Sequence, residues 1–332
     1  MENNTNPLNW KDKKILNELD INARQSASEI GKKTRISKQV VIYRINNMIK
    51  EGLIKEFITF LDIKKLGYTF YDIFFKLKYS SETEEKRIIN AIKNIPEVGW
   101  FISCRGEWNM AVCVLAKDPL NFNKILEKIL RIFEDKLIDY NFFIVIEASQ
   151  FPYKKILNIS PQKNNLNKKA HLGENLELKI TKDDYKILKE LTKDARINLV
   201  SLVDKLNISL DRVRYSIKKL ENSGVIQAYK PLLNINKLGY LWHVILIQFN
   251  YCPEKRKEEF IHFLESLPQT FYLVKGVGNW SLMFELHTDN IEEMEKTRNL
   301  IVSKFEDVIR EEKVLQILNE HKCIFLPTEI TA

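Results

Sequence analysis

Side chains that donate hydrogen bonds gather on one predicted helix in the first half of the sequence. The helix that follows Ser37 exposes Lys38, Gln39, Tyr43 and Arg44 opposite its apolar residues. Arg can form paired hydrogen bonds with guanine, and Gln can do so with adenine. Lys, Ser and Tyr mostly hold phosphates. These residue types fit contact with the base edges and backbone of double-stranded DNA. The alternative is a solvated basic helix on a small protein-interaction domain.

A second helix, at an offset of 172 residues, carries a related but different set. The remaining candidate DNA contacts are Arg35 and Ser37 in the first half and Ser209, Arg212, Arg214, Tyr215 and Lys218 in the second. Asp211 stands where the first helix has Gln39, and Ser216 stands where it has Arg44. Because a carboxylate repels DNA phosphates, we expect the second helix to bind DNA more weakly or in another register.

Two short turns between predicted strands form the other candidate site. Their residues are Arg105, Gly106, Trp108 and Asn109 in the first half, and Gly278, Asn279, Trp280 and Ser281 in the second. Glycine permits a turn with positive φ, and a neighbouring polar side chain can bind the carboxylate or ammonium group of a small ligand. The alternative is that glycine serves only the turn while tryptophan fills the core, and the sequence alone favours this alternative.

Residue patterns for catalysis and metal binding are missing from the sequence. The five histidines are scattered, neither HExxH nor GxSxG occurs, and no glycine-rich loop is present to cradle phosphates. The four cysteines form no CxxC pair and sit in apolar runs, as reduced core cysteines of an intracellular protein do. We expect no catalytic residues, no metal site and no cofactor.

Charge and hydropathy narrow the class of protein further. Lys and Arg outnumber Asp and Glu by 52 to 44, and the net charge of +8 favours a polyanionic partner. No uncharged stretch approaches the roughly 18 residues that a membrane span requires. Residues 1–10 lack the apolar segment of a signal peptide. We therefore expect a soluble, cytoplasmic protein with no membrane partner.

The sequence repeats itself once without gaps. Ala23-Arg24 recurs as Ala195-Arg196, and Leu66-Gly67-Tyr68 recurs as Leu238-Gly239-Tyr240. A repeat of this length indicates that a whole structural module is duplicated.

The sequence pattern predicts two structural units in each module. Helical spacing predicts a first helix over 11–19, Ser26 with Glu29 marks the start of a second, and Ser37 marks the start of a third. With a strand over 53–60, this order is typical of a winged helix-turn-helix. The later strands and helices follow the βαββαβ order of a ferredoxin-like sandwich. The predicted fold class is α+β, with two copies of each unit.

The predicted domain boundaries follow from these elements and from a polar, Asn/Lys-rich linker. They are 8–62 for the first winged helix, 66–150 for the first ferredoxin-like domain, 151–179 for the linker, 180–234 for the second winged helix and 238–327 for the second ferredoxin-like domain.

The ordered set of motifs resembles the Lrp/AsnC (feast/famine) transcription regulators, twice over in one chain. In the first half the resemblance rests on Asn22-Ala23-Arg24, Ile36-Ser37, Tyr43-Arg44-Ile45, Glu51-Gly52-Leu53-Ile54, Leu66-Gly67-Tyr68 and Gly106 with Trp108-Asn109. The second half matches through Asp194-Ala195-Arg196, Ile208-Ser209, Gly224-Val225-Ile226, Leu238-Gly239-Tyr240 and Gly278 with Trp280.

This resemblance implies a tandem regulator of transcription that binds specific DNA sequences. Members of the family join a winged helix to a ferredoxin-like effector domain, pair through the sheets of those domains, and often bind amino acids or related metabolites. The resemblance therefore implies that an amino acid or a similar small metabolite is the effector of this protein. The sheets would pair within one chain as a pseudo-dimer, across two chains as a homodimer, or both. An apolar second sheet face needs such a cover; the residues near it are Phe74, Phe101, Ile102, Val112 and Val114.

Two other functions stay open at this point. One is a ligand sensor or scaffold that does not bind DNA. The other is an enzyme, because the siroheme decarboxylases of haem synthesis are similar to this family in architecture. Such an enzyme needs basic and histidine side chains around a tetrapyrrole, and the segment 100–114 has no histidine and only Arg105 as a cation.

Overall fold

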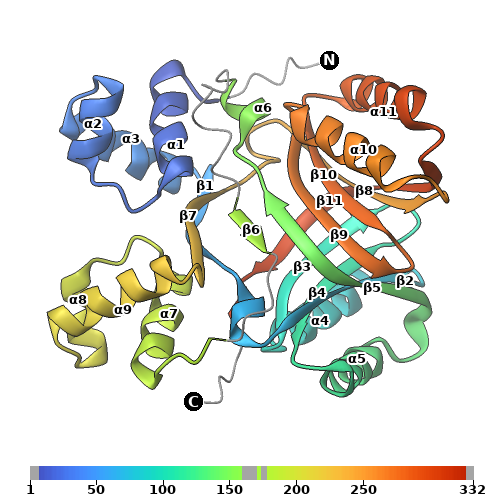
Figure 1. Ribbon diagram of the computed structural model, residues 1–332, viewed down its shortest axis with the longest axis horizontal. Helices are drawn as coiled ribbons and strands as arrows, with labels where there is room; N and C mark the ends of the chain where they lie inside the picture. Colours follow the sequence, from blue (N-terminus) through green and yellow to red (C-terminus); the bar gives the residue numbers. More distant parts are fainter. Residues whose placement is uncertain (1–6, 159–169, 173–177, 327–332) are drawn as a thin grey trace.

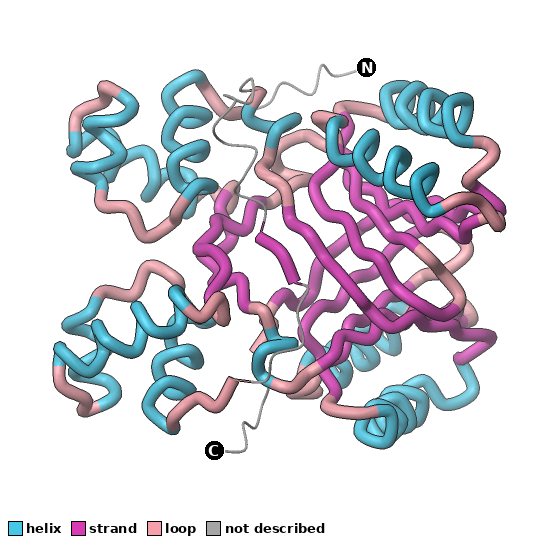
Figure 2. Tube along the Cα trace, in the orientation of Figure 1, coloured by secondary structure: helices cyan, strands magenta, loops and turns pink. Residues whose placement is uncertain are grey.

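The computed structural model describes residues 7–158, 170–172 and 178–326, and it separates two helical heads from a β-rich body (Figures 1 and 2). The first head contains α1 (Trp10–Ile21), α2 (Ala27–Thr34) and α3 (Lys38–Lys50). The second contains α7 (Lys182–Lys193), α8 (Leu199–Leu206) and α9 (Leu210–Asn222). The mixed α+β class and the duplicated order of elements agree with the sequence prediction.

Local capping determines where the head helices begin. The Ser26 hydroxyl accepts a hydrogen bond from the Glu29 N–H, and the Glu29 carboxylate accepts one from the Ser26 N–H, which completes the predicted capping box. Ser37 caps α3, as predicted, and Ser209 caps α9 in the same way. Arg35 ends α2 in the left-handed region (φ 59°), and this residue makes the turn into α3.

The strand that ends each head pairs with the strand that ends the other. Strand β1 (Ile54–Leu61) and strand β7 (Ile226–Leu233) form a two-stranded antiparallel sheet in which Ile58 lies opposite Lys230. Helix α1 packs on β7 and α7 packs on β1, so each head rests on the strand of the other half. The predicted wing is therefore a shared structure rather than a hairpin of one head.

Reciprocal side-chain contacts hold the two heads in a pseudo-two-fold arrangement. The Arg24 guanidinium donates to the carbonyls of Ala195 (2.6 Å) and Ile197 (3.1 Å). Arg196, its counterpart in the repeat, donates to the carbonyls of Ala23 and Gln25. Bonds from a charged donor to buried carbonyls are stronger than neutral ones.

A second reciprocal pair joins the base of each head to the opposite half. Lys65 donates to the Ser223 carbonyl (2.8 Å), and Lys237 donates to the Glu51 carbonyl (3.1 Å). These lysines occupy equivalent positions of the repeat, so the same pseudo-two-fold relation extends from the heads toward the body.

The body contains both ferredoxin-like units. The first is made of β2 (Thr69–Leu77), α4 (Glu82–Lys93), β3 (Val98–Arg105), β4 (Met110–Ala116), α5 (Pro119–Phe133) and β5 (Leu137–Gln150). The second is made of β8 (Leu241–Phe249), α10 (Glu254–Ser266), β9 (Thr270–Gly278), β10 (Leu282–Thr288), α11 (Ile291–Phe305) and β11 (Ile309–Cys323). Short 3₁₀ turns cover Ile63–Leu66 and Glu134–Lys136.

The two four-stranded sheets join along both edges. In the order β2-β4-β3-β11-β8-β10-β9-β5, strand β3 pairs with β11 and β9 pairs with β5, while β2 also pairs with β5 and closes the ring. Closure removes the free edges that each sheet alone would expose. The expected pseudo-dimer of sheets within one chain is present.

Each sheet buries one face against helices and the other inside the barrel. Phe74 and Ile102 belong to the interior core, as expected for the covered face. Phe101, Val112 and Val114 instead pack under α4 and α5, because alternate residues of a strand point to opposite faces. Helices α10 and α11 cover the second sheet in the same way.

The predicted linker contains two short elements. Helix α6 (Lys154–Leu157) follows β5 directly, and β6 (Ala170–Leu172) adds a strand to β5. Residues 159–169 and 173–177 of the linker, and residue 327 at the end of the last predicted domain, lie outside the described residues.

One buried ion pair has no counterpart in the other half. Lys230 on β7 places its Nζ 3.1 Å from Asp20 Oδ1 on α1, and both side chains are at most 3% exposed. Asp20 also accepts the Tyr153 N–H. The equivalent positions in the repeat hold Ile58 and Thr192, which are buried and uncharged.

We predict that Lys230→Ile lowers the free energy of unfolding by about 3 to 5 kcal/mol, because it leaves the Asp20 carboxylate buried without a cation. Urea unfolding followed by circular dichroism measures this loss. The double variant Asp20→Thr/Lys230→Ile copies the residues of the other half and is expected to regain most of the stability. A double variant as unstable as the single one would contradict the role given to the ion pair.

Candidate nucleic-acid interface and interior cavity

The candidate DNA-contact residues of α3 lie on its solvent face. Lys38, Gln39 and Tyr43 are exposed, and Tyr43 is 63% exposed. Val41, Ile45 and Met48 on the opposite face are buried in the head. The Ser37 hydroxyl accepts the Val40 N–H at the start of the helix. The helix therefore presents donors to solvent at its N-terminal end, where anions are favoured.

Arg44 does not extend freely from this surface. Its Nη1 lies 2.9 Å from Asp12 Oδ1 on α1, and the Arg44 side chain is 24% exposed. In the second head Asp184 occupies the position of Asp12 and pairs with Lys219 at 2.8 Å. The substitution of Arg44 by Ser216 in the repeat is thus accompanied by a lysine one helical turn later, which preserves the ion pair between the first and third helices.

More of the candidate DNA-contact cations are paired with acidic side chains in the second head than in the first. Arg212 pairs with Asp183 at 3.4 Å and Arg214 with Asp211 at 3.9 Å in the second head. In the first head, no carboxylate of the described residues lies within 4.0 Å of Lys38 or Arg35. The first head therefore offers the less neutralised positive surface. Ser209 caps α9, and Tyr215 and Lys218 are exposed on it.

The first predicted effector turn is occupied by contacts within the protein. A Cβ at Gly106 (φ 149°) would lie 2.8 Å from the Val314 carbonyl of β11, so the glycine permits close packing of the two halves. Both polar atoms of the Asn109 carboxamide bond the backbone of Leu77. Trp108 is buried, and its Nε1 has no partner among the described residues. Arg105 is exposed.

The second turn is used in the same way. A Cβ at Gly278 (φ 139°) would lie 2.8 Å from the Phe142 carbonyl of β5. Asn279 exchanges hydrogen bonds with the backbone of Phe142, and Ser281 bonds strand β8. Trp280 is buried with its Nε1 directed to Asn141. Both turns thus have a structural role where the halves meet, and ligand binding by their residues stays a prediction.

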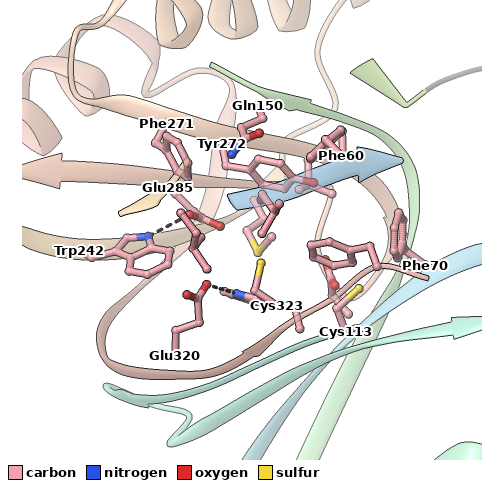
Figure 3. A pocket seen from close by; sticks show the side chains of 18 of the residues that line it. Phe60, Phe70, Cys113, Gln150, Trp242, Phe271, Tyr272, Glu285, Glu320 and Cys323 are labelled. Carbon is pink, nitrogen blue, oxygen red and sulfur yellow. Dashed lines mark hydrogen bonds between the residues drawn. The ribbon is translucent and has the colours of Figure 1, made fainter. Parts of the chain in front are cut away.

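The barrel and the two wing strands form a partly open cavity that sequence reasoning missed. It has a volume of about 70 Å³ and is lined by both sheets and by both wing strands (Figure 3). Its polar lining includes the carboxyl groups of Asp72, Glu285 and Glu320 and the carboxamide of Gln150. Aromatic rings of Phe60, Phe70, Trp242, Phe271 and Tyr272 supply much of the remaining wall.

Burial changes the protonation of the cavity acids. Removal from water raises the pKa of Asp72 to about 6 and the pKa of Glu285 to about 8. Trp242 donates to Glu285 at 2.8 Å, which opposes the second shift without cancelling it. Glu320 accepts from Trp100 at 3.1 Å and from Lys55 at 3.0 Å, so its charge has a cationic partner.

Among the described residues, no group of acidic, histidine and cysteine side chains is arranged to hold a metal ion. Nor does any helix in the described part of the chain have the length and apolarity needed to cross a bilayer.

Comparison with known sequences matches the two heads to one family. Residues 8–55 and 183–227 each match a family described as winged helix-turn-helix DNA-binding. An uncharacterised HTH-type transcriptional regulator of Pyrococcus abyssi is 32% identical over 132 residues, which cover 39% of this chain and 83% of the relative. The regulatory protein AsnC of Haemophilus influenzae is 26% identical over 136 residues, covering 41% of this chain and 90% of AsnC.

A leucine-responsive regulatory protein of Rhizobium meliloti is 46% identical over 57 residues, or 17% of this chain and 36% of the relative. Among solved structures, the siroheme decarboxylase NirDL aligns with a TM-score of 0.62 over 96% of this chain and 95% of its own, at 14% identity. That alignment shows that the tandem fold is shared along nearly the whole chain.

We predict that the stability of the protein falls between pH 6.5 and pH 8 relative to its Glu285→Gln variant. A carboxyl whose pKa is raised from 4.5 to about 8 adds stability that is complete below pH 4.5 and is lost as the pH rises through 8. Burial lowers the pKa of His287 from 6.5 to about 3. This shift makes stability rise with pH between about 3 and 6.5, below the window of the prediction.

The expected loss in that window is roughly 1.5 kcal/mol. Urea unfolding of both proteins at pH 6.5 and pH 8 isolates the contribution of Glu285, because other groups cancel in the difference. Parallel pH profiles for the two proteins would show that the carboxyl titrates near its ordinary pKa.

Proposed function

Because the chain belongs to the Lrp/AsnC family of transcriptional regulators, we propose that it binds specific sequences of double-stranded DNA with its two heads acting as one unit. The observation that carries this proposal is the shared β1–β7 sheet with its reciprocal arginine contacts. Two helix-turn-helix units held in a two-fold relation suit DNA half-sites in successive major grooves.

We propose that the two half-sites differ in sequence and in their share of the affinity. Lys38, Gln39 and Tyr43 of α3 and Arg35 before it contact the first half-site. Ser209, Arg212, Arg214, Tyr215 and Lys218 form the second, weaker contact set, since two of its arginines already have acidic partners. Arg44 is assigned to the ion pair with Asp12 rather than to base recognition.

We also propose that an amino acid or a similar small metabolite modulates DNA binding, and that the protein acts in the cytoplasm without an enzymatic reaction. The names of relatives such as the leucine-responsive regulatory protein support such an effector. Larger assemblies formed by pairing of two chains are compatible with this function.

An enzyme acting on a tetrapyrrole is the less favoured alternative. Among the described residues that line the cavity, none is Lys, Arg or His, and three are acidic. Carboxylate substituents of a tetrapyrrole would find no cationic side chain among these residues. If the protein is instead a ligand sensor or scaffold that does not bind DNA, it should show no affinity for any duplex. The following experiment tests this alternative.

We predict that Lys38→Ala weakens binding to all duplexes alike and reduces the slope of log K against log salt concentration by about 1, as expected when one phosphate contact is lost. Fluorescence anisotropy on the upstream DNA of the gene and on a scrambled duplex, over a salt series, measures both quantities. Lys218→Ala is expected to have a smaller effect on affinity.

Lys296→Ala is the matched control, because this exposed lysine lies on α11, away from the heads (Figure 1). Equal losses for Lys296→Ala and Lys38→Ala would refute the assigned interface. Failure of the unmodified protein to bind either duplex at low salt would refute DNA binding itself.

Arg44 provides a separate test. We predict that Arg44→Lys, which keeps the cation beside Asp12, leaves base preference unchanged, since the pair in the second head already uses a lysine. Loss of discrimination by a factor equivalent to about 1 to 3 kcal/mol per base pair would instead identify Arg44 as a base-reading residue. Competition between duplexes with single substitutions measures that preference.

A further inference from the structure

The barrel cavity collects hydrogen-bond acceptors from strands of both halves. Asp72 comes from β2, Gln150 from β5, Glu285 from β10 and Glu320 from β11. Figure 3 shows Gln150, Tyr272, Glu285 and Glu320 among the side chains that line this one cavity. The lining thus combines several acceptors with an apolar wall, which is the composition of a small-molecule site rather than of a core.

The charges of these acids are not all compensated within the protein. Lys55 neutralises Glu320, with its Nζ 3.0 Å from Oε2. No Lys, Arg or His of the described residues lies within 4.0 Å of the carboxyl groups of Asp72 or Glu285. Neutral donors serve them instead, namely the Cys113 thiol for Asp72 and the Trp242 indole for Glu285.

Gln150 gives an independent indication of a missing donor. Its side chain is at the cavity wall, the residue is 5% exposed, and its Oε1 has no hydrogen-bond partner among the described residues. A buried carbonyl oxygen without a donor is costly, so such atoms in proteins are usually satisfied by a ligand or by water.

The acceptors do not recur in the repeat. The positions equivalent to Asp72 and Gln150 hold Val244 and Lys322, and those equivalent to Glu285 and Glu320 hold Cys113 and Ala148. Each half therefore supplies acceptors that the other lacks. The site is complete only because the two halves close one barrel, and it occurs once per chain.

We propose that this cavity binds a small primary amine as its ammonium ion, with Glu285, Asp72 and Gln150 as acceptors and the aromatic wall around its carbon chain. An ammonium group has three donors and no acceptor, which matches a lining of acceptors. Trp242 and Tyr272 line the cavity, and aromatic rings of this kind attract cations.

The same lining selects against related ligands. An α-amino acid would place its own carboxylate beside these acids without a cation to receive it, and an alcohol of equal shape would bring no positive charge. The centres of water-sized groups have about 70 Å³ in which to lie, which is room for roughly five such groups at about 10 to 15 Å³ each. Propylamine is therefore a suitable probe.

Protonation provides a second readout. Because burial raises the pKa of Glu285 to about 8, its carboxyl is largely protonated at pH 7 in the empty cavity, and an ammonium ion would displace that proton. The other titratable groups at the cavity are Asp72, Cys113, Tyr153, Tyr272, Glu320 and Cys323, with Lys55 bonded to Glu320.

The experiment is isothermal titration of the full chain with propylamine at pH 7, in phosphate and in MOPS, neither of which contains a primary amine. The expected dissociation constant lies between about 0.1 and 10 mM for so small a ligand. The proton released from Glu285 is taken up by the buffer. The measured heat should therefore differ between the two buffers by the difference in their protonation enthalpies for one proton. Propan-1-ol and 2-aminobutyrate, which keep the carbon chain but lose the charge or add a carboxylate, are expected to bind at least tenfold more weakly.

Glu285→Gln keeps an acceptor for Trp242 and is expected to weaken propylamine at least tenfold and to abolish the buffer-dependent heat. Gln150→Met tests the site separately should the first variant fold poorly, and Glu292→Gln on the exposed surface of α11 is the matched control.

Equal affinity for propylamine and propan-1-ol would overturn the proposal, as would an unaltered affinity in both cavity variants. No binding up to about 100 mM propylamine, ten times the weakest expected dissociation constant, would overturn it as well. Because the titration contains no DNA, its outcome is independent of the proposed DNA binding.

Discussion

The pairing of β1 with β7 is the interaction on which the rest of the structure depends. Each wing strand alone would leave a row of backbone donors and acceptors exposed at its edge. The other half supplies the missing partner, together with the carbonyls that receive Arg24 and Arg196. Helices α1 and α7 each pack on the opposite wing strand. Neither head has a complete fold within its own half, so covalent duplication makes the pairing intramolecular and independent of protein concentration.

Duplication within one chain also frees the halves from being identical. In a homodimer, an acid placed at the axis appears twice, and a cation intended for it must appear twice as well. Here Lys230 faces Asp20 on one side of the wing sheet, while Ile58 and Thr192 occupy the equivalent places. The barrel interior follows the same principle, since each of its acceptors stands in only one half. A symmetric scaffold thus holds an asymmetric interior.

Sequence reasoning succeeded where the determining interactions are local. The starts of α2, α3 and α9 follow from Ser26, Ser37 and Ser209, whose hydroxyls bond backbone groups within three residues. It missed contacts that depend on distant partners. Arg44 looked available for DNA because Asp12 lies 32 residues earlier. The cavity was missed because its acids sit in different strands, although a carboxylate within an apolar strand, as in Thr69–Leu77 or Leu282–Thr288, is a signal that could have been followed.

The wing strands place a physical constraint on how cavity and heads can influence each other. Ile58 and Phe60 of β1 and Leu232 of β7 line the cavity, and the same strands support the heads. A ligand shifts an equilibrium between two arrangements only by the difference in its affinity for them. The reciprocal bonds of Arg24 and Arg196, and those of Lys65 and Lys237, all favour one arrangement of the heads. An occupant that fits this arrangement therefore stabilises it by mass action. The free energy gained grows with the logarithm of the ratio of the ligand concentration to the dissociation constant. To reorient the heads, it would have to outweigh both pairs of reciprocal contacts at once.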